Sequence, residues 1–134
     1  MMLGFADQFA PLVEGGTKTH TIRACRISIP RVGEICHCFE RPRQKTMRLL
    51  GRWPCVKVQD IFINSRVFCP EATYIDIRID GVPLSFDEKN LLAFRDGFRT
   101  DGGRFSLGEM MRYYKGRLPF SGKLIHWDFA RQIA

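Results

Sequence analysis

The sequence predicts a small, mostly β, α+β domain whose strands curl into an open barrel with helices covering its ends. Its 134 residues are enough for one ordinary core, so we expect 1–134 to form a single domain. Short alternating segments rich in β-branched residues predict the strands, and two Ser-x-x-Glu capping boxes predict helices in the second half. The order of the strands does not follow from this periodicity.

The first half of the chain is expected to contain one helix followed by strands. Apolar residues recur at helical spacing and two glycines follow them, which predicts a helix that ends before Gly15. Pro11 should shorten or kink this helix. The residues that set the spacing are Phe5, Phe9, Leu12 and Val13. The strands expected next are 19–23, 33–39 and a longer, more buried one at 55–63.

Two further strands are expected in the second half. Isoleucines alternate with charged residues over 73–79, which predicts a half-exposed strand that turns at Asp80-Gly81. A last strand at 123–129 should bury its apolar residues. Those residues are Leu124, Ile125 and Trp127. His126 on the same strand is typical of a core histidine that has a hydrogen-bond partner.

Two helices are expected between these strands. Ser85 and Glu88 form a capping box, which predicts a helix that stops at Gly97. Its buried residues are expected to be Leu91, Leu92 and Phe94. Ser106 and Glu109 repeat the signature and predict a second helix that continues to Gly116. The segment 98–105 between them suggests a loop that could cover a cleft, although a phenylalanine such as Phe98 is more often part of a core.

The cysteines and the absence of a long apolar run indicate a cytoplasmic protein that does not enter a membrane. Five cysteines without a secretion signal argue for free thiols in a reducing compartment. The crowded sequence Cys36-His37-Cys38 does not complete the usual four zinc ligands, so we interpret the two cysteines as small buried hydrophobes. No metal is therefore predicted, and no cofactor is predicted because the chemistry expected below needs only side chains and water.

Net charge points to polyanionic partners. The chain carries +7, and its cations gather in the run 41–57, which contains no acid. They are Arg41, Arg43, Lys45, Arg48, Arg52 and Lys57. With Trp53 inside the run, the segment could neutralise phosphates and offer an aromatic face to a base. The alternative is a solvated basic loop with Trp53 turned into the core, and for Trp53 itself we favour the core.

Four motifs, in this order along the chain, resemble the ASCH domain, a branch of the PUA-like superfamily. The first and most specific is Gly16-x-Lys18-Thr19-x-Thr21-Ile22-Arg23. The others are Val32-Gly33-Glu34, Leu92-Ala93-x-x-Asp96-Gly97-Phe98 and Phe120-x-Gly-x-Leu-Ile-His-Trp127. The resemblance covers nearly the whole chain. It implies a small PUA-like open β-barrel with helices around a cleft, associated with RNA and modified nucleosides.

The resemblance also implies site residues. In bacterial N(4)-acetylcytidine amidohydrolases of this family, the lysine and second threonine of the first motif act with an acid before the Gly-Phe position. Carried over, the catalytic residues are Lys18, Thr21 and Asp96, where those enzymes have glutamate in place of Asp96. Substrate or RNA contacts are expected from Arg23, Thr19, Arg43, Lys45 and Arg48. Hydrolysis of an acylated cytidine is the predicted reaction; RNA recognition without catalysis and RNA cleavage are the alternatives.

Elementary chemistry is compatible with this reaction. A threonine hydroxyl is a poor nucleophile until a base takes its proton, and a lysine can do so when desolvation or another cation lowers its pKa. On a regular strand Thr19, Thr21 and Arg23 share one face, so Lys18 must leave the strand at the glycine turn to reach the Thr21 hydroxyl. The alternative is a solvated turn lysine beside an ordinary strand threonine. The oligomeric state is not predicted.

Overall fold

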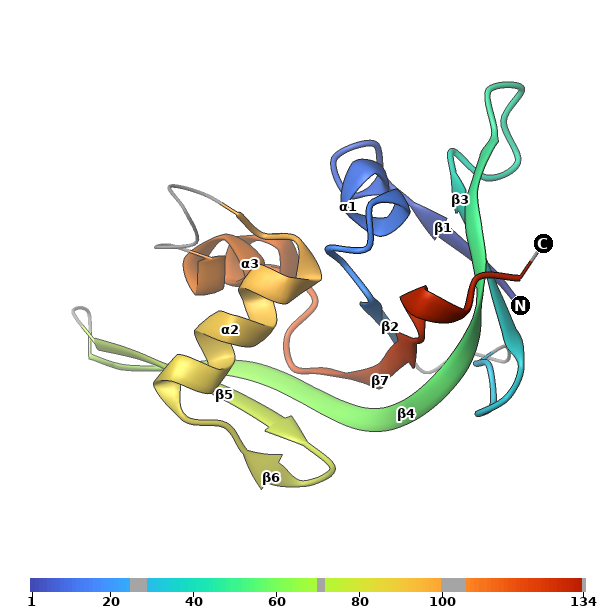
Figure 1. The fold of residues 1–134 in the computed structure, drawn as a ribbon. Helices are drawn as coiled ribbons and strands as arrows, with labels where there is room; N and C mark the ends of the chain where they lie inside the picture. Colours follow the sequence, from blue (N-terminus) through green and yellow to red (C-terminus); the bar gives the residue numbers. More distant parts are fainter. Residues whose placement is uncertain (25–28, 70–71, 100–105, 134) are drawn as a thin grey trace. The chain divides into compact units, whose positions relative to one another are not determined.

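The computed structural model of the chain describes residues 1–24, 29–69, 72–99 and 106–133, and it is a mixed α+β structure (Figure 1). Its elements are, in order, β1 (Met2–Phe5), α1 (Ala10–Glu14), β2 (His20–Ala24), β3 (Ile35–Glu40), β4 (Arg48–Cys69), β5 (Ala72–Ile79), β6 (Val82–Pro83), α2 (Phe86–Asp96), α3 (Ser106–Tyr114), β7 (Phe120–Trp127) and the 3-10 helix η2 (Phe129–Arg131). Within the described ranges, no helix has the length and apolar character needed to cross a membrane.

The seven strands are joined by backbone pairing into one sheet. Hydrogen-bonded neighbours follow the order β1-β3-β4-β5-β6, and β7 pairs with both β2 and β4. The β1–β3 pair is parallel, whereas β3–β4, β4–β5 and β5–β6 are antiparallel. Helices and strands together confirm the α+β class. For the residues described, the main path of paired strands has two ends, at β1 and β6, so the barrel stays a prediction.

The chain divides into two compact units. Unit 1 contains the described residues of Met1–Thr21, Arg26–Val58 and Ile125–Ala134. Unit 2 contains those of Ile22–Cys25 and Gln59–Leu124. The chain passes from one unit to the other within β2, β4 and β7, so each of these strands contributes residues to both cores.

Unit 1 begins with a strand where the sequence predicted a helix. Leu3 and Phe5 are buried and alternate with more exposed residues, and β1 pairs in parallel with β3. The predicted helix is therefore wrong over its first turns, because a distant partner strand satisfies the backbone there. What remains is the five-residue α1, with Pro11 in its first turn, where a missing N–H costs no helical hydrogen bond. Pro11 thus lies at the start of the helix and does not kink it.

Aromatic rings and thiols fill the core of unit 1. Trp53 is 1% exposed and stacks on Trp127, with ring centroids 6.3 Å apart and planes 17° apart, so its predicted place in the core is confirmed. Cys36, Cys38 and Cys55 are buried free thiols. Burial, reinforced by the neighbouring Cys55 thiol, raises the pKa of Cys36 to about 12, which makes it unreactive. Cys25 lies outside the described residues.

Strand β4 is much longer than predicted. It covers 22 residues from Arg48, and it pairs with β3 at one end and with β5 at the other. Because partner strands are present at both ends, much of the basic run 41–57 is strand, and the predicted loop is confined to the β3–β4 connection. We call this connection the hairpin 41–47.

Unit 2 confirms the capped helix and corrects its buried face. The Ser85 hydroxyl accepts from the Glu88 N–H at 3.2 Å, and the Glu88 carboxylate accepts from the Ser85 N–H at 3.0 Å. Leu92 is buried as expected, but Leu91 is 46% exposed. Lys89 is buried instead, since its ammonium donates to a backbone carbonyl of β5. An apolar pattern alone does not reveal a lysine that finds such an acceptor.

Strand β5 and the Asp80-Gly81 turn form as predicted. Both turn residues have positive φ angles, 50° and 79°, which suit a tight hairpin. The prediction for Asp76 is wrong: it was expected among the exposed charged residues, but it is buried, at 5% exposure. Its carboxylate accepts from Arg78 Nε at 3.1 Å, and this ion pair compensates for its burial.

Helices α2 and α3 pack on each other within unit 2 (Figure 1). The Asn90 side chain accepts from the Leu107 N–H at 3.2 Å, which fixes the start of α3. Ser106 and Glu109 lie in the first turn of α3, and the residues just before Ser106 are outside the described ranges. Phe98 is buried and Arg99 is half-buried, whereas 100–105 of the predicted covering loop lie outside the described residues. β7 begins at Phe120, earlier than expected, and buries Leu124, Ile125 and Trp127.

Candidate functional site

The glycine turn before β2 has the geometry that the opening motif requires. Gly16 has a φ of 81°, and a Cβ added there would lie 2.5 Å from the Phe129 ring, so no other residue fits without rearrangement. The N–H groups of Thr17 and Lys18 both donate to the Leu12 carbonyl at 2.9 Å. Lys18 therefore lies in the turn before β2 and not in the strand itself, as the sequence predicted.

Lys18 is buried, which rules out the solvated turn lysine. It is 3% exposed, and its Nζ lies 5.4 Å from the centroid of the Phe9 ring and 6.0 Å from that of Phe5. Lysines are almost never fully buried without a specific reason. Two aromatic rings at this distance attract an ammonium group and compensate for part of its lost hydration.

Thr21 and the neighbouring histidines lie in the same unit as Lys18. Thr21 and His20 are each 5% exposed, so β2 is buried on both faces at this point. The rings of His20 and His126 meet edge to face at 5.6 Å. Burial, and then the charges of His20 and Lys57, lower the pKa of His126 to about 4. His126 is thus neutral at pH 7. Thr19 is half-buried, and its carbonyl accepts from the Trp127 N–H at 3.1 Å.

Asp96 belongs to unit 2, where it shares an electrostatic neighbourhood with Arg23 and Tyr114. It is the last residue of α2 and is 6% exposed, so the acid sits at the helix end that the macrodipole disfavours. Burial raises the pKa of Tyr114, the Asp96 carboxylate raises it further, and Arg117 and Arg23 act in the opposite direction. Tyr114 was not among the predicted site residues.

The predicted site residues are therefore distributed over both units. Unit 1 contains Lys18, Thr19 and Thr21, and it buries Lys18 and Thr21. Unit 2 contains Arg23 and Asp96 and brings them into the neighbourhood of Tyr114. The remaining three, Arg43, Lys45 and Arg48, lie in unit 1 at the hairpin 41–47 and the start of β4.

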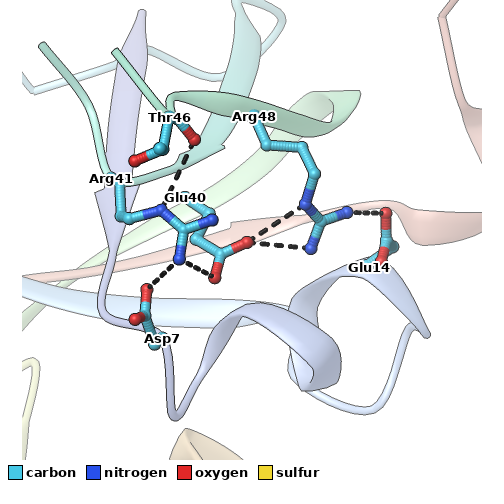
Figure 2. A network of polar contacts seen from close by, with 6 residues as sticks. All are labelled: Asp7, Glu14, Glu40, Arg41, Thr46 and Arg48. Carbon is cyan, nitrogen blue, oxygen red and sulfur yellow. Dashed lines mark hydrogen bonds and ion pairs between the residues drawn. The ribbon is translucent and has the colours of Figure 1, made fainter. Parts of the chain in front are cut away.

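The hairpin 41–47 is flanked by a network of ion pairs (Figure 2). Arg41 contacts Asp7 and Glu40, each at 3.2 Å. Arg48 contacts Glu14 at 2.6 Å and Glu40 at 2.9 Å. Glu40 therefore bridges the two arginines, and its side chain is only 10% exposed. The Arg41 Nε also donates to the Thr46 carbonyl, at 3.4 Å.

This network changes the interpretation of the basic run. Hydrogen bonds to Glu14 and Glu40 raise the pKa of Arg48, so its charge is permanent but matched by carboxylates. Arg52 donates to His37 Nδ1 at 3.1 Å. Trp53 is in the core and offers no face to a base. Arg43 and Lys45 are exposed. The alternative in which this run also offers an aromatic face to a base is wrong, because Trp53 is in the core as we favoured.

A second basic and aromatic region lies in unit 2, and sequence reasoning missed it. We call it the aromatic cluster; it comprises Phe98, Tyr113, Tyr114, Phe120 and Arg117. Successive ring centroids lie 5.5, 5.4 and 5.0 Å apart, and the Arg117 guanidinium carbon is 4.8 Å from the Tyr113 centroid. The signal was present in 112–117, where three cations, two tyrosines and a glycine stand together without an acid.

Neither a metal centre nor a known relative defines this site. Among the side chains described, no group of three or more His, Cys, Asp or Glu residues has the arrangement needed to hold a metal ion. Comparisons with protein-family models, with curated proteins and with solved structures found no match to the chain. What the fold and the site define is thus a basic α+β protein with a buried lysine in unit 1 and a buried aspartate in unit 2.

Proposed function

We propose that this chain is an ASCH-type, PUA-like open barrel of the cytoplasm that binds RNA or a modified nucleoside and hydrolyses N(4)-acylated cytidine. The burial of Lys18 in the same unit as Thr21 is the observation that carries the proposal. A lysine held against two aromatic rings costs stability compared with an apolar residue there, and catalysis is a reason to keep it. The motif around both residues resembles that of the N(4)-acetylcytidine amidohydrolases.

In the proposed reaction Thr21 is the nucleophile and Lys18 is the base. The Thr21 hydroxyl attacks the acetyl carbon while its proton passes to the Lys18 amine, and this step requires the amine in its unprotonated form. The bond from the acetyl carbon to N(4) then breaks, and the proton moves from Lys18 to N(4) as cytidine leaves. Water hydrolyses the threonine ester and releases acetate. The resemblance assigns Asp96 the role of the acid that orients the lysine or handles a proton.

Recognition without catalysis is the second candidate. The electrostatic surroundings that Asp96 shares with Arg23 and Tyr114 in unit 2 favour this second candidate. With these neighbours the aspartate could take part in binding alone, without any reaction. A ligand could accept from Arg23 and donate to Asp96 with no bond broken. The two candidates differ in what Asp96 does, and that difference can be measured.

Acetate release from N(4)-acetylcytidine tests the catalytic candidate. The wild-type protein should release acetate, and Thr21→Val, which keeps the shape but removes the hydroxyl, should lower turnover by about a thousand-fold or more. Thr17→Val is the matched control, because Thr17 is exposed in the preceding turn. No acetate at high wild-type concentration would remove the catalytic candidate. Turnover that survives in Thr21→Val would exclude Thr21 as the nucleophile.

Asp96→Asn separates the two candidates. If Asp96 acts in catalysis, the change should abolish turnover and leave nucleoside affinity within a few-fold. If Asp96 recognises the ligand, affinity should fall by roughly ten-fold, the scale of a lost charged hydrogen bond. Asp87→Asn, an exposed residue in the first turn of the same helix, is the control. Asp96→Glu restores the acid of the related enzymes and should raise turnover. Failure of all three effects would leave Asp96 a helix-end residue.

A further inference from the structure

The aromatic cluster presents a tyrosine and an arginine together at the surface of unit 2. Tyr113 is 44% exposed although its ring contacts those of Phe98 and Tyr114, at 5.5 and 5.4 Å. Arg117 follows α3 and is also exposed, and its guanidinium carbon lies 4.8 Å from the Tyr113 ring centroid. The two buried rings therefore hold an exposed ring, and that ring positions the arginine.

Further cations lie close to this pair in the sequence. Arg112 and Lys115 are exposed and lie within two positions of Tyr113; the nearest acid along the chain is Glu109 of the same helix, and 110–127 contains none. On the adjacent segment, Arg99 lies 3.9 Å from the centroid of the Phe94 ring. Its Nε is buried and has no hydrogen-bond acceptor among the described residues. Among the contacts described, Arg99 and Arg117 are thus held against rings, whereas Arg41 and Arg48 are held against carboxylates.

A guanidinium stacked on a ring has a specific chemical use. One face of its plane lies on the ring, while the opposite face can stack on a nucleobase and its N–H groups can donate to a phosphate. Tyr74 and Lys89 provide an instructive contrast in the same unit: Tyr74 is 47% exposed and has Lys89 Nζ 4.9 Å from its centroid. Lys89, however, is buried and donates to the Ile75 carbonyl, so that cation stabilises the fold.

We propose that Tyr113 and Arg117 form a stacking platform for a base of single-stranded nucleic acid, with Arg112 and Lys115 contacting the adjacent phosphates. The inference rests on the proposed function and deepens it, since it names the surface of unit 2 that holds the nucleic-acid chain. A single strand is the partner that fits, because its bases are free to stack on an aromatic platform and every base has a face to offer. The net charge of +7 favours the same partner.

The experiment compares two labelled strands with identical phosphates. Fluorescence anisotropy measures binding of the full chain to an oligouridylate of about ten nucleotides and to an abasic strand of the same length. Wild-type protein should bind the oligouridylate about ten-fold more tightly than the abasic strand. Arg117→Lys keeps the charge but loses the planar group, so it should remove most of this difference and leave abasic binding unchanged. Tyr113→Leu should do the same, and Tyr74→Leu should change neither affinity.

Two results would overturn the platform. One is equal wild-type affinity for the oligouridylate and the abasic strand. This would show a surface that binds any polyanion, and heparin should then compete equally well with both strands. The other is an unchanged preference in Arg117→Lys, which also decides the matter if Tyr113→Leu does not fold. The acetate assay with free N(4)-acetylcytidine is scored separately: acetate release without base-dependent binding removes the platform alone, and base-dependent binding without acetate release removes the catalytic proposal alone.

Discussion

The hairpin 41–47 with its flanking arginines and the aromatic cluster are both basic, yet they differ in what holds their cations. At the hairpin, Arg41 and Arg48 lie against carboxylates, and Glu40 bridges them (Figure 2). In the aromatic cluster, Arg117 lies against rings. A carboxylate neutralises a guanidinium and occupies its N–H groups, whereas a ring orients it and leaves its charge available. A basic run in a sequence therefore overstates the cations that a polyanion can reach.

Glu40→Gln should have the largest effect and would show that the hairpin arginines serve stability. Because the Glu40 side chain is 10% exposed and accepts from both arginines, its loss should lower the free energy of unfolding by about 2–3 kcal/mol. Urea denaturation measures this free energy. Glu34→Gln, at an exposed position before β3, is the control and should change it by less than about 0.5 kcal/mol. Equal effects from the two changes would mean that the network is only a surface feature.

His126 in unit 1 makes the stability of the fold depend on pH, because the folded protein favours the neutral form of this imidazole. Its pKa is lowered from 6.5 to about 4 in the folded protein, so the unfolded chain takes up a proton first as the pH falls. The contribution of the neutral imidazole is complete above about pH 6.5 and is lost progressively toward about pH 4. The wild type should lose about 2 kcal/mol over that window relative to His126→Gln. Parallel urea titrations across the window check this; parallel losses in both proteins would contradict it.

Salt dependence provides the smallest but most direct contrast between the two basic regions. Replacing Arg112 and Lys115 together by Gln should flatten the slope of log affinity against log salt for a single strand by about 1.4, at about 0.7 for each phosphate contact. Replacing Arg43 and Lys45 by Gln removes the same charge from the hairpin 41–47 and should change the slope by less than about 0.5. Equal changes from the two pairs would show that the strand contacts both regions alike.

The sequence predicted those parts of the fold that depend on neighbouring residues. The capping box at Ser85 and the Asp80-Gly81 turn form as expected, because each requires only a few adjacent side chains. Strand β1 was missed because its stability comes from a parallel partner more than thirty residues away. The burial of Asp76 and Lys89 was missed for a similar reason, since each depends on one particular partner in the folded chain.

The candidate site was predictable to the same degree. The first motif led to Lys18 and Thr21 through its resemblance to the ASCH domain, and both proved to be buried. The ion pairs of Arg41 with Asp7 and of Arg48 with Glu14 each join residues 34 positions apart, so the basic run gave no sign of them. The aromatic cluster was missed because its rings come from α3, from the segment that follows α2 and from the start of β7.

Photocrosslinking of the wild-type chain tests the central claim most directly, because it needs no substitution. A single-stranded oligonucleotide that contains 5-bromouridine is irradiated with the protein, and the crosslinked peptides are identified by mass spectrometry. We expect the crosslinked residue to be Tyr113, whose exposed ring would lie against the stacked base, and the yield to fall as salt rises. Crosslinks that fall within 41–57 and leave 106–117 unmodified would contradict the account, because they would place the nucleic acid on the hairpin 41–47 and β4.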